Sequence, residues 1–224
     1  MSAMRKPWKK SGRAPVAHPP GLMRRLIERF RGREQLLVRG PAGLPLLLVI
    51  YPRGRQDVAR LLEIAYTHTL PSLPERIFKP YGRALAMLPP IVVVLLRPEN
   101  PCGCLGHWHP PGAESRVARR LAADLSSPVA EIDLAYEMIR RWKPQPLAAL
   151  AAGEQAAAVA EIHFEAALLA VLVHELHHLA QPQAVEREIR GASNEFYGAI
   201  MRELVLDATG RHYGMIAEPR RLER

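Results

Sequence analysis

The hydrophobic positions of this chain fall into separate runs, and the spacing within each run predicts its secondary structure. Two runs of leucine and β-branched residues, 35–39 and 46–51, flank a spacer rich in glycine and proline, which predicts a loose β-hairpin. Residues 58–66 carry apolar side chains at helical spacing and predict a helix. The unbroken apolar run 91–96, bounded by prolines, predicts a buried strand.

Polar residues take a larger share of the next segments. Residues 98–112 are rich in proline and glycine and predict a loop. Residues 131–137 alternate between apolar and polar positions, which predicts a strand with one exposed face. The inward side chains of that strand would be Ile132, Leu134 and Tyr136, and the outward ones Glu131, Asp133, Ala135 and Glu137.

Two helices are expected in the last third of the chain. An alanine-rich segment from about 154 to 181 has the length of a buried helix, and Pro182 would stop it. A following helix would begin at Ser193 or Asn194 and end near 208, before Gly210. Strands followed by helices in this order predict an α+β fold.

The long helix carries the sequence His174-Glu175-Leu176-His177-His178 near its end. Residues four apart lie on one helical face, so His174 and His178 can hold one metal ion, and Glu175 can reach a water beside it. His177 falls on another face and is not expected to be a ligand. The alternative is a chance match in a polar seam. A metal is favoured because unpaired polar groups are costly on an apolar helix.

Length and composition fit one domain with an extension. The chain has 224 residues, of which 48% are hydrophobic, enough to bury a core. Residues 1–20 contain Lys, Ser, Gly and four prolines and predict a flexible basic arm. Residues 21–224 are expected to form a single α+β domain, with an N-terminal part, 21–98, and a metal-site part, 99–224.

The positive charge is concentrated at the N-terminus. The first 40 residues hold 11 Lys and Arg against two Glu, which accounts for the formal net charge of +9. Such an arm commonly follows nucleic-acid phosphates, and nucleic acid is therefore a candidate partner. A solvated tail, an anionic membrane surface or an acidic protein are the alternatives.

The sequence also indicates the cellular compartment of the protein. No apolar run approaches the roughly 20 residues that cross a bilayer, and the basic start is not followed by the apolar segment of a secretory signal. The two cysteines, Cys102 and Cys104, are too close in sequence for an ordinary structural disulfide. We therefore expect a cytoplasmic protein without disulfides.

Three segments resemble the SprT-like proteins of phages, plasmids and mobile elements, which are zincin metallopeptidases. They are Cys104-Leu105-Gly106-His107, residues 131–137, and Leu172-Val173 followed by the histidine motif. The resemblance extends over about residues 102–207, and the first 90 residues have none. It implies a small mixed or antiparallel sheet, a long helix bearing the motif and a C-terminal helix. It also implies that 131–137 is the edge strand that pairs with an extended substrate.

The third metal ligand departs from the SprT-like pattern. Those proteins usually supply a histidine where this chain has Ser193. The pair Asn194-Glu195 instead resembles the Asn-Glu pair of gluzincins, which implies Glu195 as the third ligand. A carboxylate in the first turn of a helix is the plainer role for Glu195. The other candidates for the ligand are Glu186, Glu188, Glu203, Asp207 and His212.

A second group of metal-binding residue types lies between 102 and 109. Cys102, Cys104, His107 and His109 could hold a separate structural zinc, although the spacing is tighter than in usual sites. The resemblance favours a loop on the rim of the active-site cleft, and redox chemistry is the remaining alternative. Three tyrosines could stabilise an oxyanion, and nothing in the sequence selects among Tyr136, Tyr197 and Tyr213.

Together these features predict a zinc-dependent metalloendopeptidase that acts on a protein or peptide, with one Zn²⁺ site. His174, His178 and Glu195 would bind the metal, and Glu175 would be the general base toward a metal-activated water. The basic arm and the SprT-like resemblance suggest action near nucleic acid. The alternative is a non-catalytic, zinc-containing protein of a phage or mobile element that binds nucleic acid or has a structural role.

Overall fold

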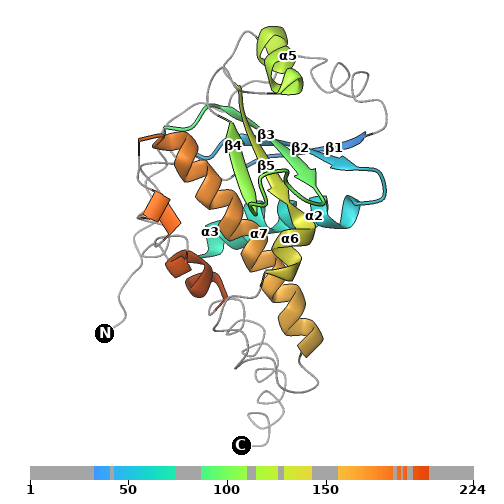
Figure 1. Ribbon diagram of the computed structural model, residues 1–224, viewed down its shortest axis with the longest axis vertical. Helices are drawn as coiled ribbons and strands as arrows, with labels where there is room; N and C mark the ends of the chain where they lie inside the picture. The colour runs from blue at the N-terminus through green and yellow to red at the C-terminus, as the bar shows by residue number, and fades with distance from the viewer. Residues whose placement is uncertain are drawn as a thin grey trace, which may run out of the picture.

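The computed structural model of the chain describes residues 33–40, 43–73, 87–109, 115–125, 129–142, 156–183, 186–187, 189–190 and 194–201. The predicted arm, 1–20, lies outside these residues, as do four residues considered for the site, Glu188, Glu203, Asp207 and His212, and also Tyr213. The described part is a mixed α+β structure in which helices cover a five-stranded sheet (Figure 1). The α+β class is therefore confirmed.

The elements alternate irregularly between strand and helix. In chain order they are β1 (Arg33–Val38), β2 (Leu46–Pro52), α2 (Gln56–Ile64), the π-helix η1 (Ala65–Thr69), α3 (Leu70–Ser72), β3 (Ile91–Arg97), β4 (Gly106–His109), α5 (Arg116–Leu125), β5 (Val129–Ala135), α6 (Tyr136–Arg141) and α7 (Ala156–Ala180). Residues 194–201 form a further helix, the predicted continuation of which lies outside the described residues.

The sheet has the order β1-β2-β3-β5-β4. β1 and β2 form the predicted hairpin, and β2, β3 and β5 run parallel to one another. β4 runs antiparallel to β5 and forms the edge of the sheet. The three parallel strands are buried almost throughout, as expected for strands with both faces covered. The predicted hairpin and the predicted strand at 91–96 are thus confirmed.

Helices cover both faces of the sheet. On one face α2, η1 and α7 pack over alternate residues of the strands, including Val94 and Ile132. On the other face α5 packs over the residues between them, including Val93 and Val129. Side chains of β5 therefore divide by position, with even numbers toward α7 and odd numbers toward α5. This division places Glu131 and Asp133 on the α5 face.

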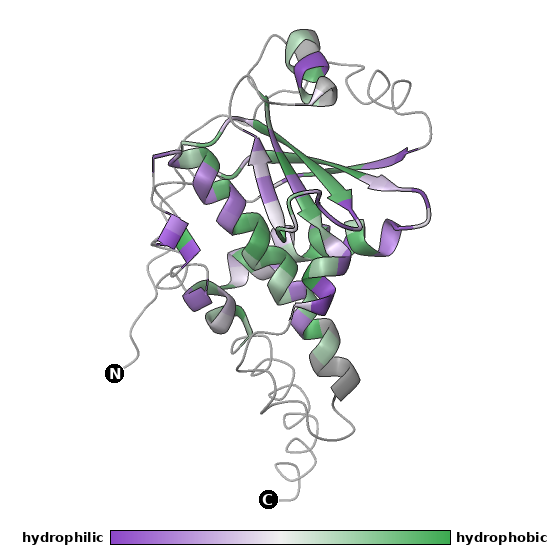
Figure 2. Ribbon diagram, in the orientation of Figure 1, coloured by the Kyte–Doolittle hydropathy of each residue, from purple (hydrophilic) through white to green (hydrophobic). Residues whose placement is uncertain are grey.

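The predicted long helix is confirmed as α7. The thirteen residues from Phe164 to Leu176 are, apart from Glu165 and His174, fully or almost fully buried. The helix is apolar over its middle and becomes polar near its C-terminal end, where the histidines lie (Figure 2). It ends at Ala180, just before Pro182, as predicted. The predicted helix at 58–66 is α2 together with the beginning of η1. Within the described part of the chain, no helix combines the length and apolar character of a membrane span.

Two predictions about the sheet edge are wrong. Residues 106–109 form β4, although 98–112 was predicted to be a loop. β5 lies between β3 and β4 and has no exposed face, although 131–137 was predicted to be a half-exposed edge strand. Tyr136 and Glu137, at the end of the predicted strand, belong to α6. The physical reason is that β4 occupies the edge and α5 covers the face that carries the carboxylates.

Candidate metal centre and cleft

α7 brings His174 and His178 together at its C-terminal end. Their Nε2 atoms lie 3.1 Å apart, and their rings meet edge to face. Both side chains are only slightly exposed. Burial, together with the neighbouring His178, lowers the pKa of His174 to about 4, and burial also lowers the pKa of His178. Both imidazoles are therefore neutral near pH 7, which is the form that binds a metal.

The carboxylate of Glu186 lies beside these two histidines. Its Oε2 atom lies 2.9 Å from His178 Nε2 and 3.9 Å from His174 Nε2. Its other oxygen, Oε1, accepts a hydrogen bond from Arg190 at 3.1 Å. Glu186 was one of the alternatives considered for the third ligand, and among the described residues it forms a group of three metal-binding side chains with His174 and His178.

The three donor atoms have the spacing of a zinc site. Tetrahedral ligands at roughly 2.0–2.1 Å from one zinc ion are separated from each other by about 3.3 Å. The three separations of 3.1, 2.9 and 3.9 Å bracket that value. Two neutral imidazoles and one carboxylate are also a common ligand set of catalytic zinc. The residues present therefore fit a zinc ion.

The structure does not bring Glu195 to these histidines. The helix 194–201 lines the cleft with Asn194, Tyr197 and Gly198, which share one helical face. Glu195 follows Asn194 by one residue, about 100° round the helix, and its side chain is exposed. It is also absent from the residues that line the cleft. The arrangement favours Glu186 over Glu195 as the third ligand.

Glu175 lies beneath the edge strand. It is only 5% exposed, and its carboxylate accepts a hydrogen bond from the backbone N–H of Trp108 on β4. Burial, reinforced by the negative charge of Glu186, raises the pKa of Glu175 to about 8. A carboxyl group with such a pKa can exchange a proton near neutral pH.

Gly106 makes this close approach of β4 to α7 possible. A Cβ atom at position 106 would lie 2.5 Å from Glu175 Oε1 and 2.8 Å from a methyl group of Val171. Any larger residue would therefore push β4 away from α7 or displace the carboxylate. Trp108, two residues further along the same strand, stacks on the ring of His178. β4 thus positions the Glu175 carboxylate through Gly106 and Trp108, and supports the His178 ring through the Trp108 ring.

A cleft of about 950 Å³ opens over this group. β4, α7 and the helix 194–201 contribute most of its lining, and the rest comes from Trp142, Glu186, Arg190 and the loop 103–105. One edge of β4 is paired with β5, and no described strand pairs with the other. His177 lies off the metal group, as predicted, and its Nε2 atom is 3.0 Å from Gln181.

A buried histidine fixes one wall of the cleft. His163 Nε2 lies 2.7 Å from the backbone oxygen of Trp142, which can only accept, so Nε2 carries the proton. In the tautomer with its proton on Nε2, Nδ1 accepts a hydrogen bond from the Tyr197 hydroxyl at 2.6 Å. Among the predicted oxyanion candidates, Tyr197 lines the cleft with its proton engaged by His163, whereas Tyr136 lies in the core and does not line the cleft.

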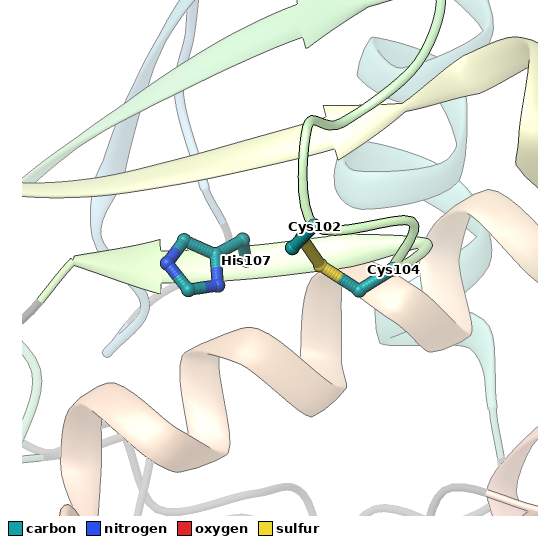
Figure 3. A group of neighbouring side chains, drawn as sticks. All are labelled: Cys102, Cys104 and His107. Atoms are coloured by element: carbon teal, nitrogen blue, oxygen red, sulfur yellow. A yellow bond between two sulfur atoms is a disulfide. The ribbon is translucent and has the colours of Figure 1, made fainter.

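The loop at 102–104 forms part of the rim of the cleft, as the resemblance implied. Gly103, Cys104 and Leu105 all line it. Cys102 and Cys104 are joined in a disulfide, and His107 lies beside them on β4 (Figure 3). The prediction of a chain without disulfides is therefore wrong. Gly103 adopts a positive φ of 72°, which reverses the chain and brings the two Cα atoms to 5.4 Å.

Sequence reasoning missed Gly106 and His163. His163 is eleven residues before His174, close to three helical turns, so both lie on nearly the same face of α7. That spacing was a usable signal. No local sequence pattern indicated the role of Gly106, because that role depends on the contact between a strand and a helix that are far apart in sequence.

The chain matches no known family model, and no curated protein or solved structure is significantly similar to it. The function therefore has to be inferred from the geometry of the cleft.

Proposed function

We propose that this protein is a zinc-dependent metallopeptidase whose active site is the cleft between β4 and α7. The observation that carries the proposal is the convergence of His174, His178 and Glu186 beside a buried Glu175. The ligands leave one side of the group facing the cleft, as a catalytic site requires and a structural site does not.

His174, His178 and Glu186 would hold the metal. When bound, zinc would lower the pKa of a water toward about 7 and polarise the carbonyl of a peptide bond. Arg190 binds the Glu186 oxygen that does not face the histidines, and so orients this ligand. Trp108 keeps the His178 ring in place by stacking on it.

Glu175 would act as the general base. Its pKa of about 8 suits a group that accepts a proton from water and later passes it to the leaving amine. The Trp108 N–H holds the carboxylate in one orientation, which limits the number of positions from which it can act.

The edge of β4 that no described strand pairs with would bind the substrate in an extended conformation. Main-chain hydrogen bonds to a sheet edge hold a peptide with little dependence on its sequence. This assigns to β4 the substrate-pairing role that was predicted for residues 131–137. Peptide segments are favoured over small molecules because the cleft, of about 950 Å³, is bordered by a strand edge.

The test is cleavage of a casein or quenched-peptide substrate by the zinc-loaded chain and by Glu175→Gln. The variant should keep its zinc and lose cleavage by at least a hundredfold, because the residue acts on water and not on the metal. Glu63→Gln on α2, away from the cleft, is the control and should cleave normally.

Two outcomes would contradict the proposal. Equal cleavage by the Glu175→Gln variant would remove Glu175 from the reaction. Zinc binding without any cleavage by the unaltered chain, accompanied by salt-dependent binding of nucleic acid, would instead support the non-catalytic alternative.

A further inference from the structure

A second group of metal-binding side chains lies on the opposite face of the sheet from α7. His109 on β4 pairs directly with Glu131 on β5, and Asp133 follows two residues later on the same face of β5. Trp108 and Ile132, the alternate residues, point toward α7. The group of His109, Glu131 and Asp133 is therefore separated from the candidate zinc site by the sheet itself.

The two carboxylates are buried almost completely. Glu131 is 0% exposed and Asp133 is 5% exposed. One atom of each residue in the group, namely His109 Nε2, Glu131 Oε1 and Asp133 Oδ1, is buried without a hydrogen-bond partner. Buried polar atoms are rarely left without one, because losing water without a replacement is costly.

The neighbouring residues hold one oxygen of each carboxylate and leave the other oxygen without a hydrogen bond. Ser115 donates a hydrogen bond to Oε2 of Glu131, not to Oε1. Arg97 contacts Oδ2 of Asp133 at 3.0 Å, not Oδ1. Oriented carboxylates with one oxygen supported from outside and the other directed inward are typical of metal ligands.

The donor atoms also lie at the right separations. His109 Nε2 is 3.7 Å from Glu131 Oε1, close to the roughly 3.3 Å between tetrahedral zinc ligands. It is 3.4 Å from Asp133 Oδ2, the oxygen that also contacts Arg97. One donor atom from each of the three residues can be chosen so that all lie within 4.8 Å of one another. A nitrogen donor beside two carboxylates suits zinc better than calcium or magnesium, which prefer oxygen alone.

We propose that His109, Glu131 and Asp133 bind a second divalent cation of the zinc type, which holds β4 to β5. A proton on one carboxylate could satisfy only one pair of these groups, whereas one cation could bind a donor atom of each of the three residues. The site would be structural, because α5 covers this face and the carboxylates have almost no exposed surface. It would stiffen the strand that carries Gly106 and Trp108.

The experiment is a zinc titration of the full chain after its metal has been removed with a chelator. The unaltered chain should bind two equivalents, and Asp133→Asn and His109→Ala should each bind one. His107→Ala is the matched control, since it removes an imidazole two residues away on the same strand face, and it should bind two. His178→Ala should also bind one equivalent, because this change removes the site on α7. The titration therefore counts the two sites independently of any peptidase activity.

A single equivalent in the unaltered chain that is lost in His178→Ala but kept in Asp133→Asn would overturn the proposal. If far-UV circular dichroism shows that Asp133→Asn does not fold, His109→Ala decides, because His109 lies on the edge strand and is partly exposed. Two equivalents retained by folded His109→Ala would overturn it equally.

Discussion

Two clusters of histidine and carboxylate side chains lie on opposite faces of the β4–β5 pair, and they differ in how the chain assembles them. On the α7 face, His174, Glu175 and His178 come from little more than one helical turn and line the cleft. On the α5 face, His109 meets Glu131 and Asp133 only because two strands pair. A cluster within one helix can be recognised from its spacing, whereas a cluster across strands requires the register.

β4 is the element common to both clusters. On the α7 side it contributes Gly106 and the Trp108 N–H, and on the α5 side it contributes His109. Changes in β4 and its neighbours therefore test whether the two clusters depend on one another.

Gly106→Ala should have the largest effect. The added Cβ would overlap Glu175 and Val171, so we expect a loss of about 1–3 kcal/mol in the free energy of unfolding and a loss of most cleavage. Urea unfolding measures the first and a peptide assay the second. The loss of stability should be smaller in a Glu175→Ala background, where part of the overlap is gone. An equal loss in both backgrounds would show that Glu175 is not the obstacle.

The pH dependence of the metal-free protein should reveal the buried Glu175. Its pKa is raised to about 8 by burial, so the folded chain keeps a proton that the unfolded chain has already released. The free energy of unfolding therefore decreases as pH rises toward 8. Below pH 6.5, His174, with its pKa lowered to about 4, acts in the opposite direction, because only the unfolded chain is protonated there.

Glu175 consequently dominates between pH 6.5 and 8, where we expect it to lower the free energy of unfolding by about 1–2 kcal/mol. Urea unfolding of the chelated protein across this window measures the change. Glu175→Gln should remove it. An identical slope in the variant would mean that Glu175 ionises normally in the fold.

Tyr197→Phe should have the smallest effect of the stability changes. It leaves Nδ1 of the buried His163 without its donor, which we expect to cost about 1 kcal/mol in the free energy of unfolding. Tyr51→Phe on β2 is the control, because no hydrogen bond of its hydroxyl to another described residue is found. Equal stability of the two variants would show that the bond to His163 does not matter to the fold.

The elements that the sequence predicted correctly are those defined by local patterns. The hairpin of β1 and β2, the strand β3 and the helix α7 all follow from continuous apolar runs and their boundaries. The relation of His174 to His178 follows from the helical repeat alone. Within such segments the side chains that decide the structure are neighbours along the chain.

The predictions that were wrong concern features that depend on contacts between segments far apart in the sequence. β4 has only four residues, Gly-His-Trp-His, and no apolar run marks it as a strand. Glu131 and Asp133 indicated an exposed face because carboxylates are seldom buried, but β4 and α5 enclose them. The Glu195 prediction rested on a resemblance to the Asn-Glu pair and stays a prediction, while Glu186 is the carboxylate that lies 2.9 Å from His178.

The most direct test of the account is the zinc affinity of Glu186→Gln compared with that of Glu195→Gln. Both changes remove one negative charge from an exposed glutamate after α7, but only Glu186 contacts His178, at 2.9 Å. Competition with a chromophoric chelator should show affinity at the α7 site at least tenfold weaker in Glu186→Gln and unchanged in Glu195→Gln. Unchanged affinity in Glu186→Gln, with weakened affinity in Glu195→Gln, would contradict the account.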